Sequence, residues 1–268
     1  MKRLKTLASR AGREAEGLLL LEGTHLLQEV LRGGTAPQEI IATEVWLQRH
    51  PELAQRCSRA SWRIVTDDVL RAALTTVTPD GVACLIRLDA LPTVPSKLDF
   101  VLVLDRIQDP GNLGTLLRTA LAADVDAVWL GGGVDPLGTK VLRASAGALL
   151  QLPHQRFGPS EEKAISMLQQ ELKQLTASGV QVVATLVPDP SQVDPPLPYW
   201  DLDWTLPTAL VLGTEGAGLH PDLQACCTHA VTLPHSPRVE SLNVASAAVP
   251  LLLERRRATM TATSQQFG

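Results

Sequence analysis

Short apolar runs alternate with stretches of helical periodicity along the chain, and this alternation restricts the fold more than any other feature of the sequence. The run FVLVL at residues 100–104 contains no polar residue, as is typical of a strand buried on both faces of a parallel sheet. Further strands are predicted at residues 127–130, 181–186, 209–212 and 230–233, and helices at residues 112–123, 140–150, 161–177 and 242–257. The pattern predicts an α/β fold with a mostly parallel sheet.

The first ninety residues contain a smaller set of alternating strands and helices. Strands are predicted at residues 17–22, 39–42, 62–65 and 82–87, and helices at residues 24–32 and 51–59 and in the stretch that ends at residue 74. We expect Thr24 to cap the first of these helices and Asp67 or Asp68 to cap the last. This part of the chain is therefore predicted to form a compact α/β unit.

Two proline-rich segments interrupt the pattern. The segment LPTVPSK at residues 91–97 contains two prolines, which disfavour a helix, so we place a domain linker there. Residues 188–207 are also rich in proline and are predicted to form a long surface loop. The sequence thus predicts two domains, residues 1–90 and residues 98–260.

Composition excludes several classes of protein. Of the 268 residues, 45% are hydrophobic and 19% are charged, which excludes wholesale disorder. No apolar run approaches the roughly 18 residues of a membrane span and no signal-peptide core follows the N-terminus, so we expect a cytoplasmic or organellar protein. Because the four cysteines form no C-x-x-C pair, we expect reduced thiols and no metal site.

The first thirteen residues are basic and contain no acid. The cations are Lys2, Arg3, Lys5, Arg10 and Arg13. Such a segment can contact the phosphates of a nucleic acid, or it can be a solvated and partly mobile terminus. The net charge of -4 argues against a protein that coats nucleic acid along its whole surface.

Two loops that follow predicted strands combine glycines with polar side chains, and ligands gather at the carboxyl ends of strands in open α/β sheets. The first loop is DRIQDPGNLGTLLRTA, residues 105–120. In it, Asn112 is either a helix cap or a functional amide, and Arg118 is either a phosphate clamp or a surface ion-pair partner. The second loop is LGTEGAGL, residues 212–219, in which three glycines lie beside the carboxylate of Glu215.

A third loop, LPHSPRVESLNVASAA at residues 233–248, places Ser241 and Asn243 on either side of Leu242 where the last helix is predicted to begin. Ser241 is a candidate helix cap there. No G-x-S-x-G surrounds it, which argues against hydrolase chemistry, and no G-x-G-x-x-G follows a strand, which argues against an ordinary dinucleotide site.

Together, and in this order, the three loops resemble the three signature motifs of the SpoU, or TrmH-like, family of RNA ribose 2′-O-methyltransferases in the SPOUT superfamily. The segment KVLRASAGALLQLP is similar to the family's segment between the first two motifs, and LLLLEGTHLLQEVL and TPDGVACLIR resemble its substrate-binding domain. The resemblance implies an α/β fold: a SPOUT-type knotted parallel-sheet domain with a C-terminal trefoil knot, preceded by a small substrate-binding domain similar to a ribosomal-protein fold.

The resemblance also implies a cofactor, S-adenosylmethionine, and a homodimer with active sites at the subunit interface. The cofactor-binding positions that it implies are Leu212, Gly213, Gly218, Leu233 and Leu242. The catalytic neighbourhood that it implies consists of Asn112, Arg118, Glu215, Ser241 and Asn243. An arginine has been assigned as the base in this family, but a guanidinium stays protonated in proteins. We therefore expect Arg118 to clamp a phosphate or ribose, and the base is left open.

The implied substrate is structured RNA, ribosomal RNA more than transfer RNA, and the alternative is a non-catalytic RNA-binding assembly factor. The aromatic content of 3% favours recognition of phosphates and shape over base stacking. The chain departs from the family's usual pattern at Pro237, where glycine is common, and at Thr214, where asparagine is frequent. Pro250 lies within the last predicted helix and is expected to kink it.

Overall fold

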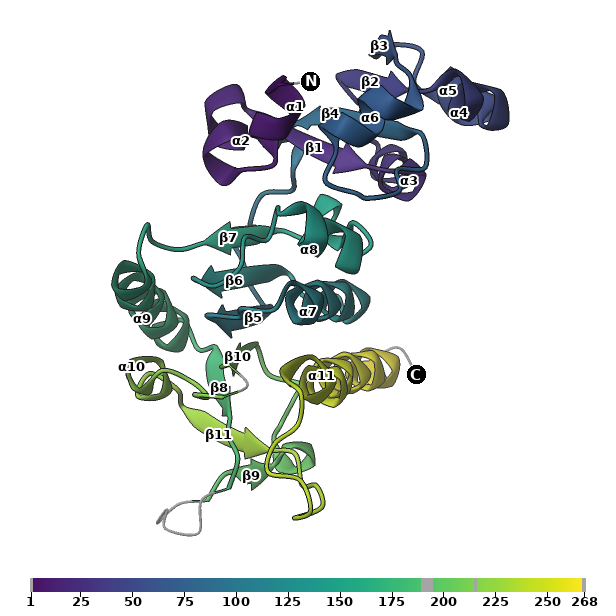
Figure 1. Cartoon of the computed structure of the whole chain (residues 1–268). Coiled ribbons are helices and arrows are strands. Elements are labelled where there is room, and N and C mark those ends of the chain that lie inside the picture. Colours follow the sequence, from purple (N-terminus) through teal and green to yellow (C-terminus); the bar gives the residue numbers. More distant parts are fainter. Residues whose placement is uncertain (1, 189–194, 215, 267–268) are drawn as a thin grey trace. The chain divides into compact units, whose positions relative to one another are not determined.

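The chain folds into two compact units in the computed structural model, which describes residues 2–188, 195–214 and 216–266 (Figure 1). One unit consists of Met1–Pro92 and Asp135–Gln151, and the other of Thr93–Val134 and Leu152–Gly268. The segment Asp135–Gln151 therefore packs with the first unit although it connects two strands of the second. Within the described ranges, no helix has the length and apolar character needed to cross a membrane.

The second unit is built on a seven-stranded sheet in which every pair of neighbours is parallel, as predicted. In spatial order the strands are β7 (His154–Arg156), β6 (Ala127–Gly131), β5 (Phe100–Asp105), β10 (Thr208–Leu212), β8 (Gln181–Thr185), β11 (His229–Thr232) and β9 (Leu197–Pro198). Every residue of β5 and β10 is buried, which explains the apolar runs at residues 100–104 and 209–212.

Helices cover both faces of this sheet (Figure 1). They are α7 (Pro110–Ala122) and α11 (Val244–Gln266), which contact each other, and α9 (Glu161–Ala177) and α10 (Pro221–Gln224). Because side chains alternate along a strand, Val101 and Val103 of β5 belong to the same core cluster as Leu168 and Leu172 of α9. The central strands are thus fixed by packing and pairing, which holds the loops at their ends in place.

The predicted elements differ from the observed ones mainly where an element is short or contains proline or glycine. β7, β9 and α10 are too short to leave a periodic pattern. The helix predicted at residues 140–150 is divided into α8 (Thr139–Ala144) and a 3-10 turn (Ala148–Leu150), because Gly147 adopts a left-handed conformation with φ 77°. α11 continues through Pro250.

The first unit contains a four-stranded mixed sheet in the order β1 (Leu18–Glu22), β4 (Val82–Arg87), β2 (Glu39–Ala42) and β3 (Ser61–Ile64). Only the β2–β3 pair is parallel. The surrounding helices are α1 (Lys2–Leu7), α2 (Arg10–Glu16), α3 (Thr24–Arg32), α4 (Glu44–Arg49), α5 (Pro51–Arg56) and α6 (Asp67–Ala73). Two hydrophobic clusters use alternate residues of β1, so that its four leucines are all buried.

Both predicted caps in this unit are wrong by one residue. Gly23 precedes α3, and the Thr24 hydroxyl instead accepts a hydrogen bond from Trp46 Nε1 at 2.8 Å. Thr66 caps α6, with its side-chain oxygen accepting the Val69 N–H, so the Asp67 and Asp68 carboxylates lie in the first turn. A cap needs extended backbone, and tertiary contacts decide which residue adopts it.

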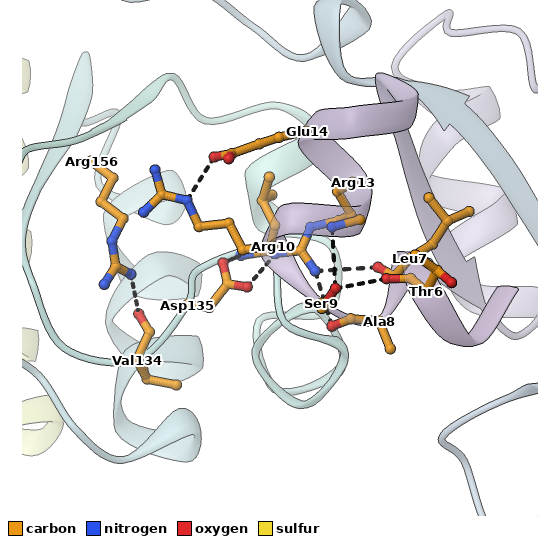
Figure 2. Close-up of polar contacts among 12 residues, drawn as sticks. Thr6, Leu7, Ala8, Ser9, Arg10, Arg13, Glu14, Val134, Asp135 and Arg156 are labelled. Atoms are coloured by element: carbon orange, nitrogen blue, oxygen red, sulfur yellow. Dashed lines mark hydrogen bonds and ion pairs between the residues drawn. The ribbon is translucent and has the colours of Figure 1, made fainter. Parts of the chain in front are cut away.

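The basic N-terminal segment is helical over Lys2–Leu7 and from Arg10 onward, and its cations are exposed except for Arg13. Arg13 is 3% exposed; its guanidinium donates to the carbonyls of Leu7 and Ala8 and pairs with Asp135 (Figure 2). Arg3 pairs with the carboxylates of Glu16 and Glu39. Arg13 is therefore a structural cation that is unavailable to a nucleic acid.

Truncating a core valine of β5 should destabilise the protein far more than truncating an exposed valine. Val103 is 0% exposed and Val77 is 83% exposed. We expect Val103→Ala to lower the free energy of unfolding by about 2 kcal/mol, because two buried methyl groups and their packing are lost. Val77→Ala should change it by less than about 0.5 kcal/mol. Urea denaturation followed by circular dichroism measures both, and equal effects would contradict the assigned core.

Candidate functional site

The carboxyl ends of β5, β10, β8 and β11, which are neighbours in the sheet, lie at one edge, and the loops that follow them surround two adjoining cavities. The larger cavity, of about 510 Å³, is lined by the loops after β8, β10 and β11. The smaller, of about 220 Å³, is lined by the loop after β5 together with residues of the other two motif loops. Thr214, Gly216 and Val244 line both cavities, which therefore share a wall.

All the residues that the sequence predicted for cofactor binding line the larger cavity. They are Leu212, Gly213, Gly218, Leu233 and Leu242, and Ser241 lies with them. Leu212 is the buried last residue of β10, whereas the Leu242 side chain is 37% exposed. Residues predicted from separate motifs are thus brought together in one cavity.

Backbone atoms form much of one wall because the loop after β10 folds back on itself. The N–H of Thr214 donates to the carbonyl of Gly218, and the N–H of Gly218 donates to the carbonyl of Thr214, both at 3.0 Å. A Cβ atom at Gly213 would overlap the backbone of Gly218 and Leu219. Glycine is therefore required at residue 213 for the turn to close, and it leaves main-chain groups facing the cavity.

Further lining residues were not identified from the sequence. Thr185, Leu186 and Val187, at and after the end of β8, line the larger cavity, and so do His235 and Glu240. Only the apolar strand at residues 181–186 could have indicated the first group, since its carboxyl end lies at the ligand edge of a parallel sheet. The loop after β8 lacks glycines, so it did not stand out.

The larger cavity has features that fit S-adenosylmethionine. The Thr185 hydroxyl is buried and has no hydrogen-bond partner among the described residues, so a polar ligand would satisfy it. The Glu240 carboxylate can attract the positive charge of this cofactor. His235 Nδ1 lies 2.7 Å from the Leu233 carbonyl oxygen, which can only accept, so His235 Nδ1 donates and Nε2 is left as an acceptor.

The side chains of Asn112 and Asn243 meet beside the smaller cavity. Asn243 Nδ2 donates to Asn112 Oδ1 at 3.0 Å, joining the first turn of α7 to the start of α11. Asn112 is not the cap of α7, because Asp109 accepts the Asn112 N–H at 2.7 Å. Nor does Ser241 cap α11, because Asn243 Oδ1 accepts the Ser246 N–H at 3.1 Å.

The remaining predicted residues are less closely grouped. Arg118 is exposed on α7, and it forms no hydrogen bond or ion pair with any described residue. Its guanidinium is therefore available to a ligand, whereas the ion-pair alternative lacks a partner in the described chain. Glu215 lies outside the described residues.

Metal-ligating side chains do not cluster within the described ranges: no three of them gather where they could hold an ion. The four cysteines are free thiols, of which Cys57 and Cys84 are buried and the other two are half-buried. Burial raises the pKa of Cys227 to about 12, so its thiol is protonated near neutral pH. Thiolate chemistry is not indicated at Cys227.

Sequence models of two protein families match the chain. The model of the SpoU rRNA Methylase family matches residues 99–252, which is more than half of the chain and includes all three motif loops. The model of the MRM3-like substrate binding domain matches residues 1–84. Both matches agree with the resemblance inferred from the motifs.

Individual relatives match along nearly the full length. An uncharacterized tRNA/rRNA methyltransferase of Synechocystis is 39% identical, over 98% of this chain and 93% of the relative. The 23S rRNA (guanosine(2553)-2′-O)-methyltransferase RlmP of Bacillus subtilis is 30% identical, over 96% and 95%. The structure of an AdoMet-bound rRNA methyltransferase from Sinorhizobium meliloti, 25% identical, matches with a TM-score of 0.76 over 96% of this chain and 93% of that one.

Replacing Gly213 should open the cavity wall. In Gly213→Ala the new methyl group would displace the backbone of residues 218 and 219, so we expect binding of S-adenosylmethionine to weaken by about tenfold or more. Isothermal titration calorimetry measures this affinity. Gly33→Ala is the matched control, because a Cβ there meets only ordinary contacts of 3.6 Å or more in the other unit. Unchanged affinity in Gly213→Ala would contradict the role of the loop.

Proposed function

The chain belongs to the SpoU rRNA methylase family, and on this basis we propose that it transfers a methyl group from S-adenosylmethionine to a ribose 2′-hydroxyl of structured RNA, with ribosomal RNA as the preferred substrate class. The observation that carries the proposal is the convergence of the three motif loops on one edge of the parallel sheet. There a cavity suited to the cofactor shares a wall with a second cavity that Asn112 lines. The methyl donor and the ribose that accepts the methyl group would therefore lie next to each other.

The residues of the larger cavity would hold S-adenosylmethionine, which supplies an electrophilic methyl group on a positively charged sulfur. Gly213, Gly216 and Gly218 line the cavity without side chains, so their backbone would contact the cofactor at close range. Leu212, Leu233 and Leu242 would provide apolar contacts. The Thr185 hydroxyl would gain the partner that it lacks.

The side chains around the smaller cavity would orient the RNA. The Asn112 and Asn243 amides are hydrogen-bonded to each other, and Asn243 is held in place because it also caps α11. Arg118 would use its planar guanidinium to hold a phosphate or ribose. Displacement at a methyl group requires oxygen, carbon and sulfur in line, so orientation of the hydroxyl by these groups would supply much of the rate enhancement.

The base that removes the hydroxyl proton stays open. Arg118 is a poor candidate, because a guanidinium remains protonated near neutral pH. We propose Ser241 and Glu215 as further members of the catalytic neighbourhood, on the grounds that both belong to loops that form the cavity. Ser241 lines it directly.

Ribosomal RNA is the preferred substrate class because the RlmP relative is named for 23S rRNA. We propose that residues 1–90 bind this RNA and that residues 98–260 carry the reaction, and the two separate family models support this division. A trefoil knot in the C-terminal region belongs to the proposal on the basis of family membership. A homodimer and a cytoplasmic location complete the proposal, on the basis of family membership.

The direct test incubates the protein with methyl-labelled S-adenosylmethionine and either ribosomal or transfer RNA that lacks modifications. Nuclease digestion and mass spectrometry then identify the labelled nucleoside. A 2′-O-methylated nucleoside from ribosomal RNA is the expected result, and the same product from transfer RNA would reassign the substrate. Label on a base would contradict the proposed reaction, and cofactor binding without transfer to any RNA would favour an assembly factor.

Loss of the Arg118 guanidinium should separate catalysis from cofactor binding. We expect Arg118→Ala to reduce methyl transfer by roughly a hundredfold or more, because the acceptor hydroxyl is no longer oriented. The affinity for S-adenosylmethionine should change by less than about twofold, since Arg118 lies outside the described lining of the larger cavity. Arg118→Lys keeps the charge but loses the planar fork, and it should recover only part of the activity. Retained turnover in Arg118→Ala would exclude the clamp.

A further inference from the structure

Asp105 is a buried carboxylate at the carboxyl end of β5 that the proposed chemistry does not use. Its side chain is 0% exposed and accepts three hydrogen bonds. Arg106 Nε donates to Oδ1 at 2.8 Å and Arg106 Nη2 donates to Oδ2 at 3.0 Å. The backbone N–H of His220 donates to Oδ2 at 2.9 Å.

These three bonds connect the two loops between which methyl transfer is proposed to occur. Arg106 is the first residue of the loop that leads from β5 to Asn112. His220 directly follows Leu219, which lines the larger cavity together with Gly218. One carboxylate therefore joins the start of the acceptor-side loop to the end of the cofactor-side loop.

The surroundings of Arg106 make this connection rigid. Arg106 has a positive φ of 53°, a conformation that residues other than glycine rarely adopt, so its contacts must hold it there. Arg106 Nη1 also donates to Glu161 Oε1 at 3.0 Å, and the hydrogen bonds to Asp105 and Glu161 raise the pKa of the guanidinium. The cation is thus permanent and held on two sides.

The loop that leads from β5 to Asn112 also contacts the segment that follows β6. A Cβ at Gly133 would overlap the backbone of Ile107, so the two segments are in direct contact. The Val134 N–H donates to the Ile107 carbonyl at 2.8 Å, and Arg156 donates to the carbonyls of Gly133 and Val134 (Figure 2). These contacts hold the part of the loop around Ile107, and Asp105 holds its start.

We propose that Asp105 is a positioning residue for methyl transfer, which sets the placement of the Asn112 loop relative to the wall of the cofactor cavity. The inference rests on the proposed function. An in-line displacement is sensitive to misplacement of about 1 Å. The buried carboxylate of Asp105 joins both loops, so its loss should lower the rate of methyl transfer. Asparagine cannot replace it, since its NH₂ group would face an N–H donor where an acceptor is needed.

Asp105→Asn is the primary test, with three measurements on the full-length protein. In single turnover at saturating cofactor, the transfer rate should fall roughly a hundredfold. The dissociation constant for S-adenosylmethionine, measured by calorimetry, should rise by about tenfold or less, because only one end of its loop is released. Hydrogen exchange of the His220 amide should accelerate, since it loses its charged acceptor.

Asp126→Asn is the matched control, because Asp126 contacts the opposite end of β5. Asp126 Oδ2 accepts the N–H groups of Asp99 and Phe100, both at 2.7 Å, where β5 begins. The same chemical change should therefore lower the thermal stability but leave the transfer rate within about twofold of wild type. It should also leave the exchange of the His220 amide unchanged.

Several outcomes would overturn the inference. A rate in Asp105→Asn within about threefold of wild type would exclude positioning, and so would an equal loss of rate in Asp126→Asn. If Asp105→Asn does not fold, Arg106→Lys replaces it: the charge is kept but the two-point contact is lost, and a rate equal to wild type would then refute the role. Absence of transfer by the wild type contradicts the proposed function instead, and the His220 exchange still tests the connection.

Discussion

Parallel pairing brings the carboxyl ends of β5, β10, β8 and β11 to one edge of the sheet, and the candidate site depends on this arrangement. Each loop begins at a strand that is buried and paired on both sides, so its first residue is fixed in space. Segments more than a hundred residues apart, such as those of Asn112 and Asn243, can therefore form a 3.0 Å hydrogen bond. The sheet fixes the positions at which the loops begin, and the loops carry the side chains of the candidate site.

Backbone and side chains have different roles at this edge. The proposed cofactor side is shaped by main-chain groups, because Gly213 allows Thr214 and Gly218 to form their two mutual backbone hydrogen bonds. The acceptor side presents amide side chains, which the caps of α7 and α11 hold in place. Asp105 lies between the two and bonds to a residue of each loop. A reaction that needs alignment more than proton transfer suits such a division.

Much of the fold was predictable because long apolar strands and periodic helices are local properties of the sequence. β5 and α9 were predicted to within one residue at each end. The caps were not, since Asp109 rather than Asn112 caps α7 and Asn243 rather than Ser241 caps α11. A cap depends on where the backbone becomes extended, and several neighbouring polar residues qualify equally from the sequence. Nor did the sequence indicate that Arg13 is buried, because its partners include the distant Asp135.

The sequence by itself determined the α/β class and the three motif loops, because strand periodicity and glycine placement are encoded locally. The resemblance of these loops to the SpoU family, and not periodicity, indicated five of the residues that line the larger cavity. Only the tertiary structure decided which of these residues meet. It paired Asn112 with Asn243, added the end of β8 to the cavity and gave the buried Asp105 its bonds to both loops. These contacts join residues distant in the chain, and the order of strands in the sheet, which no local pattern specifies, brings them together.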